Sequence, residues 1–250
     1  MSRRNKGLER KSKGQLKDPR KVFVVATEGA VTEPAYFDLL DAYIQQTDSL
    51  NNRVKIIPLR REKLDDDDVE GLKLKRKRGE PTSKDSAPDY VLQQLEHFFE
   101  KNALKAEDEL WCIVDRDRWT IRPSQKGLGL KGVARECLKK GYHFCLSNPN
   151  FELWLLLHVK NIADYSPEEC AELLKNQKSK SGKTPLEREL SKILPSGYTK
   201  VKLARTDFLP NLSFAIEQAK SLDTDPNARW IDNVLYTKVY QLVEKIINPS

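Results

Sequence analysis

The stretch KVFVVATEG, residues 21–29, is an apolar run that ends in a glutamate and a glycine. A second stretch, LWCIVDRD at residues 110–117, is an apolar run that ends in Asp-x-Asp. Strands of a buried parallel sheet have such continuous apolar sequences, because helices cover both faces of the sheet. The two stretches therefore predict β-strands, over 22–26 and 109–114, in an α/β fold.

Segments of helical periodicity alternate with further apolar runs along the chain. We expect strands at 53–59 and 142–146, and helices that begin at Thr32–Pro34 with Thr32 as N-cap, over 88–102, over 133–140 and at 147–150. From residue 161 onward the pattern is helical, over 167–176, 185–194, 207–222 and 230–246. This order predicts a parallel sheet of about four strands flanked by helices, with a helical C-terminal part.

The chain divides into three regions by composition. Residues 1–20 are rich in Lys and Arg and lack apolar periodicity, so we expect a flexible basic arm that either contacts nucleic acid or is only a solvated tail. Residues 21–160 form the predicted α/β domain, with a charged loop or insertion at 60–86, and residues 161–250 form a helical region packed on it. The aspartate run at 65–68 is interpreted as solvated and not as a metal site.

Charge and cysteine usage limit the class of protein. There are 44 Lys and Arg against 37 Asp and Glu, a net charge of +7, which favours polyanionic partners over cationic ones or serves solubility alone. No segment approaches the roughly 20 apolar residues of a membrane span, and the N-terminus lacks the apolar core of a secretory signal, so we expect a cytoplasmic protein. The four cysteines form no C-x-x-C pair, which predicts free thiols.

Acidic side chains follow the two strands that decide the fold. Glu28 ends the first run, and Asp115 and Asp117 end the second. Ligand sites of open α/β sheets lie beyond the carboxyl ends of the strands, so these carboxylates are expected in one crevice. Their repulsion is relieved by a hard cation with oxygen ligands, such as Mg²⁺ or Mn²⁺. The alternative for Asp115 and Asp117 is a plain polar turn.

Three further residues are candidates for the same site. Glu152 lies in a very apolar segment and needs a partner, so it is either a site residue or half of a buried salt bridge. Glu33 is at a helix start, where it either binds metal or favours the helix dipole. Lys200 is in a loop, where it is either solvated or holds charge that develops on a phosphate oxygen.

Three segments together resemble the RloB-like family: residues 23–29 with 32–37, residues 113–117, and the Ser-Asn-Pro-x-Phe-Glu-x-Trp segment at 147–154. That family is encoded near bacterial restriction loci, often beside an AAA-type ATPase, and resembles the Toprim fold. The resemblance implies a Toprim-like sheet, with a Glu after the first strand and an Asp-x-Asp after a later one. By it, Glu28, Asp115 and Asp117 are metal ligands and catalytic residues. Glu33 and Glu152 match further acidic ligands, and Lys200 matches a catalytic lysine.

The resemblance implies a Mg²⁺- or Mn²⁺-dependent nuclease of anti-phage defence that cleaves DNA or RNA, tRNA among the candidates, with an AAA-type ATPase partner. Two alternatives stay open. A haloacid-dehalogenase-like phosphatase also uses Asp-x-Asp after a strand, with the first Asp as nucleophile. A catalytically silent module would bind nucleic acid or the ATPase without cutting. The choice of DNA or RNA, the cleavage site, the trigger and whether the protein is a homo-oligomer are not determined by the sequence.

Overall fold

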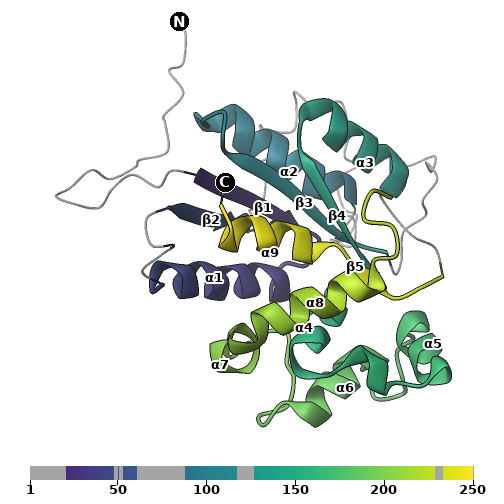
Figure 1. The fold of residues 1–250 in the computed structure, drawn as a ribbon. Coiled ribbons are helices and arrows are strands. Elements are labelled where there is room, and N and C mark those ends of the chain that lie inside the picture. The colour runs from purple at the N-terminus through teal and green to yellow at the C-terminus, as the bar shows by residue number, and fades with distance from the viewer. Residues whose placement is uncertain are drawn as a thin grey trace, which may run out of the picture.

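The computed structural model describes residues 21–47, 50, 53–60, 88–116, 127–228 and 233–249. The predicted basic arm at 1–20, nearly all of the charged segment at 60–86, and Asp117 lie outside the described residues. Within the described parts the fold is α/β, as predicted, with a helical C-terminal part below the sheet in Figure 1.

The sheet has five strands in the order β2-β1-β3-β4-β5. Four strands are parallel: β1 (Lys21–Thr27), β2 (Val54–Pro58), β3 (Glu109–Asp115) and β4 (His143–Asn148). The fifth, β5 (Tyr236–Thr237), runs antiparallel to β4. This strand lies inside the segment 230–246 that was predicted to be helical, and that prediction was wrong there. A two-residue strand is too short for periodicity to reveal, and it forms only because Ser147 and Asn148 of β4 are available to pair with it.

Helices cover both faces of the sheet, and the alternation of side chains along β1 shows how. Phe23 and Val25 face one core, which the helices α1 (Thr32–Gln45), α4 (Glu152–Val159), α8 (Leu212–Leu222) and α9 (Val239–Ile247) complete. Val22, Val24 and Ala26 face the other core, which α2 (Pro88–Lys101) and α3 (Gly129–Lys140) cover. Burial on both faces explains why this strand is apolar throughout.

The C-terminal helices pack around α4, whose residues 152–158 are all buried. The helix α8 and the helix α6 (Pro185–Ile193) lie against it, and α5 (Pro167–Lys175) packs on α6. The predicted helix 207–222 is interrupted: α7 (Arg205–Phe208) and a 3₁₀ turn (Leu209–Asn211) precede α8. Pro210 explains the break, because proline has no N–H for the helical ladder.

Local capping signals were partly confirmed. Gly141 follows α3 in the left-handed conformation, at φ 74°, as the sequence predicts. Ser166 and Thr184 form capping boxes in front of α5 and α6. The prediction of Thr32 as N-cap was wrong, since Val31 precedes the helix and no side chain caps it. The predicted helix start at 147–150 was also early, because β4 continues to Asn148 and α4 begins at Glu152.

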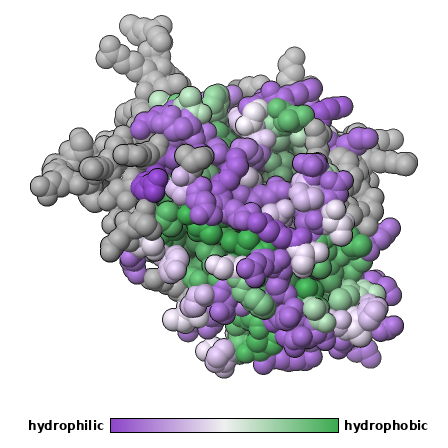
Figure 2. All heavy atoms as spheres, viewed as in Figure 1, coloured by the Kyte–Doolittle hydropathy of each residue, from purple (hydrophilic) through white to green (hydrophobic). Residues whose placement is uncertain are grey.

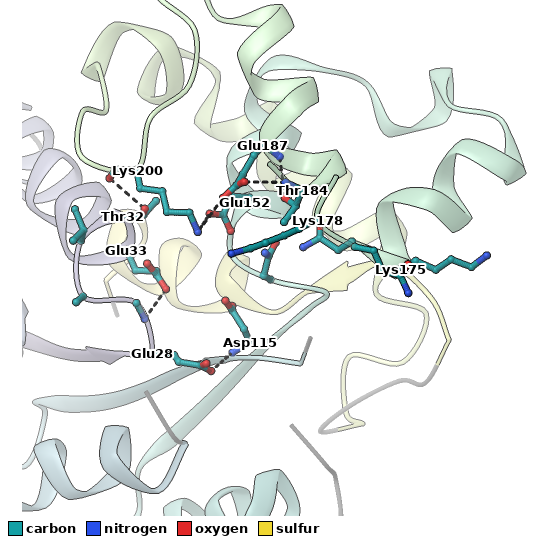
Figure 3. Close-up of a pocket in the computed structure, with 16 residues that line it drawn as sticks. Glu28, Thr32, Glu33, Asp115, Glu152, Lys175, Lys178, Thr184, Glu187 and Lys200 are labelled. Atoms are coloured by element: carbon teal, nitrogen blue, oxygen red, sulfur yellow. Dashed lines mark hydrogen bonds and ion pairs between the residues drawn. The ribbon is translucent and has the colours of Figure 1, made fainter. Parts of the chain in front are cut away.

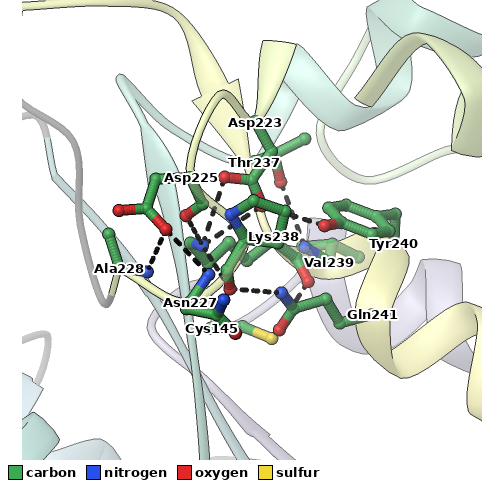
Figure 4. A network of polar contacts seen from close by, with 11 residues as sticks. Cys145, Asp223, Asp225, Asn227, Ala228, Thr237, Lys238, Val239, Tyr240 and Gln241 are labelled. Carbon is green, nitrogen blue, oxygen red and sulfur yellow. Dashed lines mark hydrogen bonds and ion pairs between the residues drawn. The ribbon is translucent and has the colours of Figure 1, made fainter. Parts of the chain in front are cut away.

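A buried polar network fixes β5 to the end of α8 (Figure 4). The ammonium group of Lys238 contacts both carboxylate oxygens of Asp223, at 3.2 and 3.1 Å, and also donates to the backbone oxygens of Asp225 and Pro226. Tyr240 donates its hydroxyl to the same Asp223 carboxylate at 2.9 Å. Because Lys238 and Asp223 are 2% and 4% exposed, this ion pair is part of the core.

The outer surface in the view of Figure 2 is mostly hydrophilic, with hydrophobic areas scattered among charged ones. None of the helices in the described residues combines the length and the apolar character that crossing a bilayer requires. Three cysteines, Cys112, Cys137 and Cys145, are buried, and all four are free thiols, as predicted.

Candidate active site

Glu28 and Asp115 lie side by side at the carboxyl edge of the sheet. Glu28 directly follows β1 and Asp115 is the last residue of β3, and these strands are adjacent and parallel. The Glu28 N–H donates to the backbone oxygen of Ile113 at 3.0 Å, so the ladder continues past β1. A Glu28 carboxylate oxygen in turn accepts from the Asp115 N–H at 3.1 Å. The structure therefore brings together two acids that are 87 positions apart in the sequence.

Glu33 folds back over the turn that follows Glu28. Its Oε1 accepts from the N–H of Gly29 at 2.8 Å. A Cβ atom at position 29 would lie only 1.8 Å from Oε2 of Glu33, so glycine is required for this approach. Burial, and then the negative charge of Glu152, raise the pKa of Glu33 from 4.5 to about 7. Glu33 is thus a buried carboxylate that exchanges its proton near neutral pH.

The chain after β4 contributes Asn150 and Glu152 to the same edge. The N–H of Arg116 donates to the backbone oxygens of Ser147 and Pro149, which extends the pairing of β3 with β4 to this segment. Asn150 is 5% exposed, and its Oδ1 has no hydrogen-bond partner among the described residues. Glu152, 3% exposed, is the first residue of α4.

Lys200 reaches Glu152 from the C-terminal part of the fold. Its Nζ lies 3.0 Å from Glu152 and 3.1 Å from Glu187. Tyr198 donates its hydroxyl to the Glu152 carboxylate at 3.1 Å. Burial alone would lower the pKa of Lys200, but the carboxylates of Glu152 and Glu187 outweigh it and raise that pKa, so the ammonium stays charged. The buried salt bridge that the sequence left as the alternative for Glu152 is present, inside the candidate site.

Thr32 connects the start of α1, which carries Glu33, to the loop that carries Lys200. Its hydroxyl donates to the backbone oxygen of Lys200 at 3.2 Å, across 168 positions of sequence. Thr32, which was predicted to cap α1, therefore holds the loop around Lys200 next to the first turn of that helix. The same turn contains Glu33.

One pocket of about 600 Å³ is lined by these acidic side chains together with Thr32, Asn150 and Lys200 (Figure 3). Glu28, Glu33 and Asp115 come from the sheet edge and the start of α1, while Lys175 and Lys178 come from the end of α5 and the loop after it. Five predicted site residues, Glu28, Glu33, Asp115, Glu152 and Lys200, thus meet in the structure. The sixth, Asp117, lies outside the described residues.

Sequence reasoning missed further lining residues, among them Asn150, Lys175, Asn176, Lys178 and Glu187. Glu187 had a local signal, because it is the capping-box acid that accepts from the Thr184 N–H at the start of α6. Lys175 ends α5 and Lys178 lies in the loop after it, and by composition alone such basic residues are interpreted as solvated. Asn176 had no sequence signal of a site role.

The oxygen atoms that line the pocket can be compared with the ligands that a bound metal ion requires. Within the described residues, no three His, Cys, Asp or Glu side chains are grouped closely enough to hold a metal ion. Mg²⁺, however, is usually bound by one or two carboxylates, with water and substrate phosphate completing its shell. The pocket offers the carboxylates of Glu28 and Asp115 and the buried Oδ1 of Asn150, which has no partner in the part of the chain that the structure describes. Hard oxygen donors of this kind fit Mg²⁺ or Mn²⁺.

Comparison with known proteins gives one result. A family model described as RloB-like protein matches residues 23–246. Neither the curated proteins nor the solved structures gave a match. The matched residues span nearly the whole chain and include every described residue of the candidate site. The chain therefore belongs to the RloB-like family.

Proposed function

We propose that this protein is a Mg²⁺- or Mn²⁺-dependent nuclease that hydrolyses phosphodiester bonds of DNA or RNA, and that it acts with an AAA-type ATPase in anti-phage defence. The observation that carries the proposal is the meeting of Glu28 and Asp115 on adjacent strands, opposite lysines in one pocket. An acid after the first strand and another after its parallel neighbour is also the arrangement expected of a Toprim-type site. The ATPase partner and the defence role rest on the family resemblance.

Each residue has a distinct task in this proposal. Glu28 and Asp115, with Asp117 two positions further along, would hold the ion. The bound ion would supply Lewis-acid activation of water and neutralisation of charge on the phosphate. Glu33 has a pKa of about 7, which suits a group that accepts a proton from water at neutral pH.

Lys200 is the cation opposite the acidic edge. Its contacts with Glu152 and Glu187 keep it charged and hold its ammonium group inside the pocket. A fixed cation stabilises the negative charge that grows on phosphate oxygens in the transition state. Glu152 acts here through Lys200, as a positioning residue.

The pocket also has features that suit a polyanionic substrate. Lys175, Lys178 and Lys200 line it together with the acids. Lysines attract a phosphate backbone by an electrostatic term that weakens with salt. Cleavage that depends steeply on salt is therefore expected, whichever nucleic acid is cut.

The proposal is tested with Glu28→Gln and Asp115→Asn, and with Glu168→Gln as a control at an exposed acid of α5. Each protein is incubated with Mg²⁺ and separate pools of DNA, total RNA and tRNA, with and without the co-encoded ATPase. The pocket variants should lose cleavage by roughly 10²-fold or more while the control keeps it. Undiminished cleavage by either folded pocket variant would remove the site.

One observation favours a second candidate, a catalytically silent binding module. The described residues contain no preformed three-ligand metal group. Such a module would bind the nucleic acid pools, with affinity that falls as salt rises, and would leave them intact with the ATPase present. Calorimetry with Mg²⁺ alone, set beside the cleavage assay, separates the two functions.

A further inference from the structure

Asn176 is a buried side chain of the pocket that the proposed chemistry does not use. It follows α5 in the left-handed conformation, at φ 46°, and its N–H donates to the backbone oxygen of Glu172. The side chain lines the pocket and is 7% exposed. Both of its polar atoms, Nδ2 and Oδ1, are fully buried and have no hydrogen-bond partner in the described part of the chain.

The backbone conformation does not explain this burial. Asparagine tolerates the left-handed region, so it is a common residue at the end of a helix. Asn233 has the same conformation, at φ 61°, and is exposed, so its amide can bond to water. Buried polar groups in folded proteins nearly always have partners, and an amide with neither its donor nor its acceptor satisfied needs an explanation.

Water can pair with both groups of the amide, but among the parts of a substrate the chemistry of the amide limits the choice. A metal ion would pair with Oδ1 but not with Nδ2. A phosphate offers acceptors alone, so it would pair with Nδ2 and leave Oδ1 without a donor. A nucleobase edge offers a donor and an acceptor side by side, and adenine, with N6–H beside N7, is the base that an asparagine amide pairs with in a bidentate manner.

We propose that Asn176 is a specificity-determining residue that pairs with a nucleobase, adenine in preference, of the nucleotide next to the bond that is cut. This rests on the proposed function. The pocket, at about 600 Å³, is within the usual 300–1,000 Å³ range of ligand sites. The lysines of the same pocket, and the ion that its acids would hold, would bind the phosphate, and the amide of Asn176 would select the base.

Three variants test this assignment. Asn176→Gly keeps the left-handed backbone and removes the amide, and Asn233→Gly makes the same exchange at the exposed position. Asn176→Asp replaces the donor and acceptor by acceptors only, and a carboxylate pairs with the cytosine amino group. Random-sequence DNA and RNA pools are cut with Mg²⁺, and the products are sequenced to give the base frequencies beside each cut.

The wild type and Asn233→Gly should favour adenine at one position beside the cut. Asn176→Gly should reduce that preference by roughly 5- to 150-fold, which is the usual value of a bidentate base contact, while total cleavage persists. Asn176→Asp should shift the preference toward cytosine. Cleavage by the wild type without base preference, or an unchanged preference in Asn176→Gly, would overturn the assignment and leave the nuclease proposal standing.

A binding assay separates failure of the inference from failure of the proposed function. The same proteins are titrated, with Mg²⁺ present, into labelled oligonucleotides that contain only one base each, and anisotropy is measured. If the wild type cuts nothing, either alone or with the ATPase, the nuclease proposal fails. Tighter binding of oligo-adenine that Asn176→Gly abolishes would then still support base recognition, and equal binding of all four oligonucleotides would refute it.

Discussion

Replacement of Glu33 by glutamine tests the electrostatics of the pocket without any assumption about its activity. The variant keeps the oxygen that accepts from the Gly29 N–H and removes the charge. Burial and the neighbouring Glu152 raise the pKa of Glu33 from 4.5 to about 7, so the folded protein binds this proton more tightly than the unfolded chain. The stability of the wild type should therefore fall as the pH rises from about 4.5 through about 7.

The size of the effect follows from the same two pKa values. Ionisation of Glu33 lowers the free energy of unfolding by about 3 kcal/mol at high pH, and most of this develops between about pH 5 and about pH 8. Glu33→Gln does not carry this penalty. The gap in stability between variant and wild type should therefore widen by about 2–3 kcal/mol over this range, or about 5–10 °C in melting temperature.

The stability of the variant has to be compared with that of the wild type at each pH. The reason is that a second buried group, His158, changes the stability of the fold with pH in the opposite direction. Burial lowers the pKa of His158 to about 4, so His158 makes the fold less stable as the pH falls below its usual value of 6.5. This contribution is common to both proteins and cancels in the difference.

Urea unfolding of both proteins at about pH 5, 6, 7 and 8 measures the gap. A difference that is constant across the series would refute the raised pKa of Glu33 and the crowding of acids from which it arises. Mg²⁺ adds a second readout: if it binds beside Glu33, it should stabilise the wild type most at high pH and shrink the gap.

Three further predictions concern single contacts of the fold and the site. Gly29→Ala should displace the Glu33 carboxylate, since its Cβ would lie 1.8 Å from Oε2, and should lower the affinity for Mg²⁺ in calorimetry about tenfold or more with the protein still folded. Lys238→Met should lower the free energy of unfolding in urea by about 3–5 kcal/mol, because it leaves a buried carboxylate without its ion-pair partner; a loss below about 1 kcal/mol would contradict the buried pair. Lys200→Ala should slow cleavage by roughly 10²-fold, whereas Lys202→Ala, at an exposed position of the same turn, should not; equal effects would argue for a general charge contribution.

The parallel part of the sheet was predictable because its signals are local. The strands expected at 22–26, 53–59 and 109–114 are β1, β2 and β3 with one residue or less of difference at each end. β1 and β3 are apolar runs with polar residues at their ends, and burial on both faces allows little else, whereas β2 is only partly buried and contains Lys55. The C-terminal part was harder, since β5 and the break at Pro210 depend on a neighbouring strand and on one residue within a helical pattern.

The sequence by itself determined that acids follow the ends of parallel strands, which placed Glu28 and Asp115 at the same edge of the sheet. Parallel strands present their carboxyl ends at one edge, whatever their order in the sheet. The tertiary structure decided that Glu28 and Asp115 meet, because β1 and β3 are neighbours in the sheet. Only the tertiary structure decided that Lys200 pairs with Glu152 and Glu187, and that Asn176 is buried in the same pocket. These contacts depend on how the C-terminal helices pack against the sheet edge, and no periodicity or local motif encodes a meeting of loops so far apart in the chain.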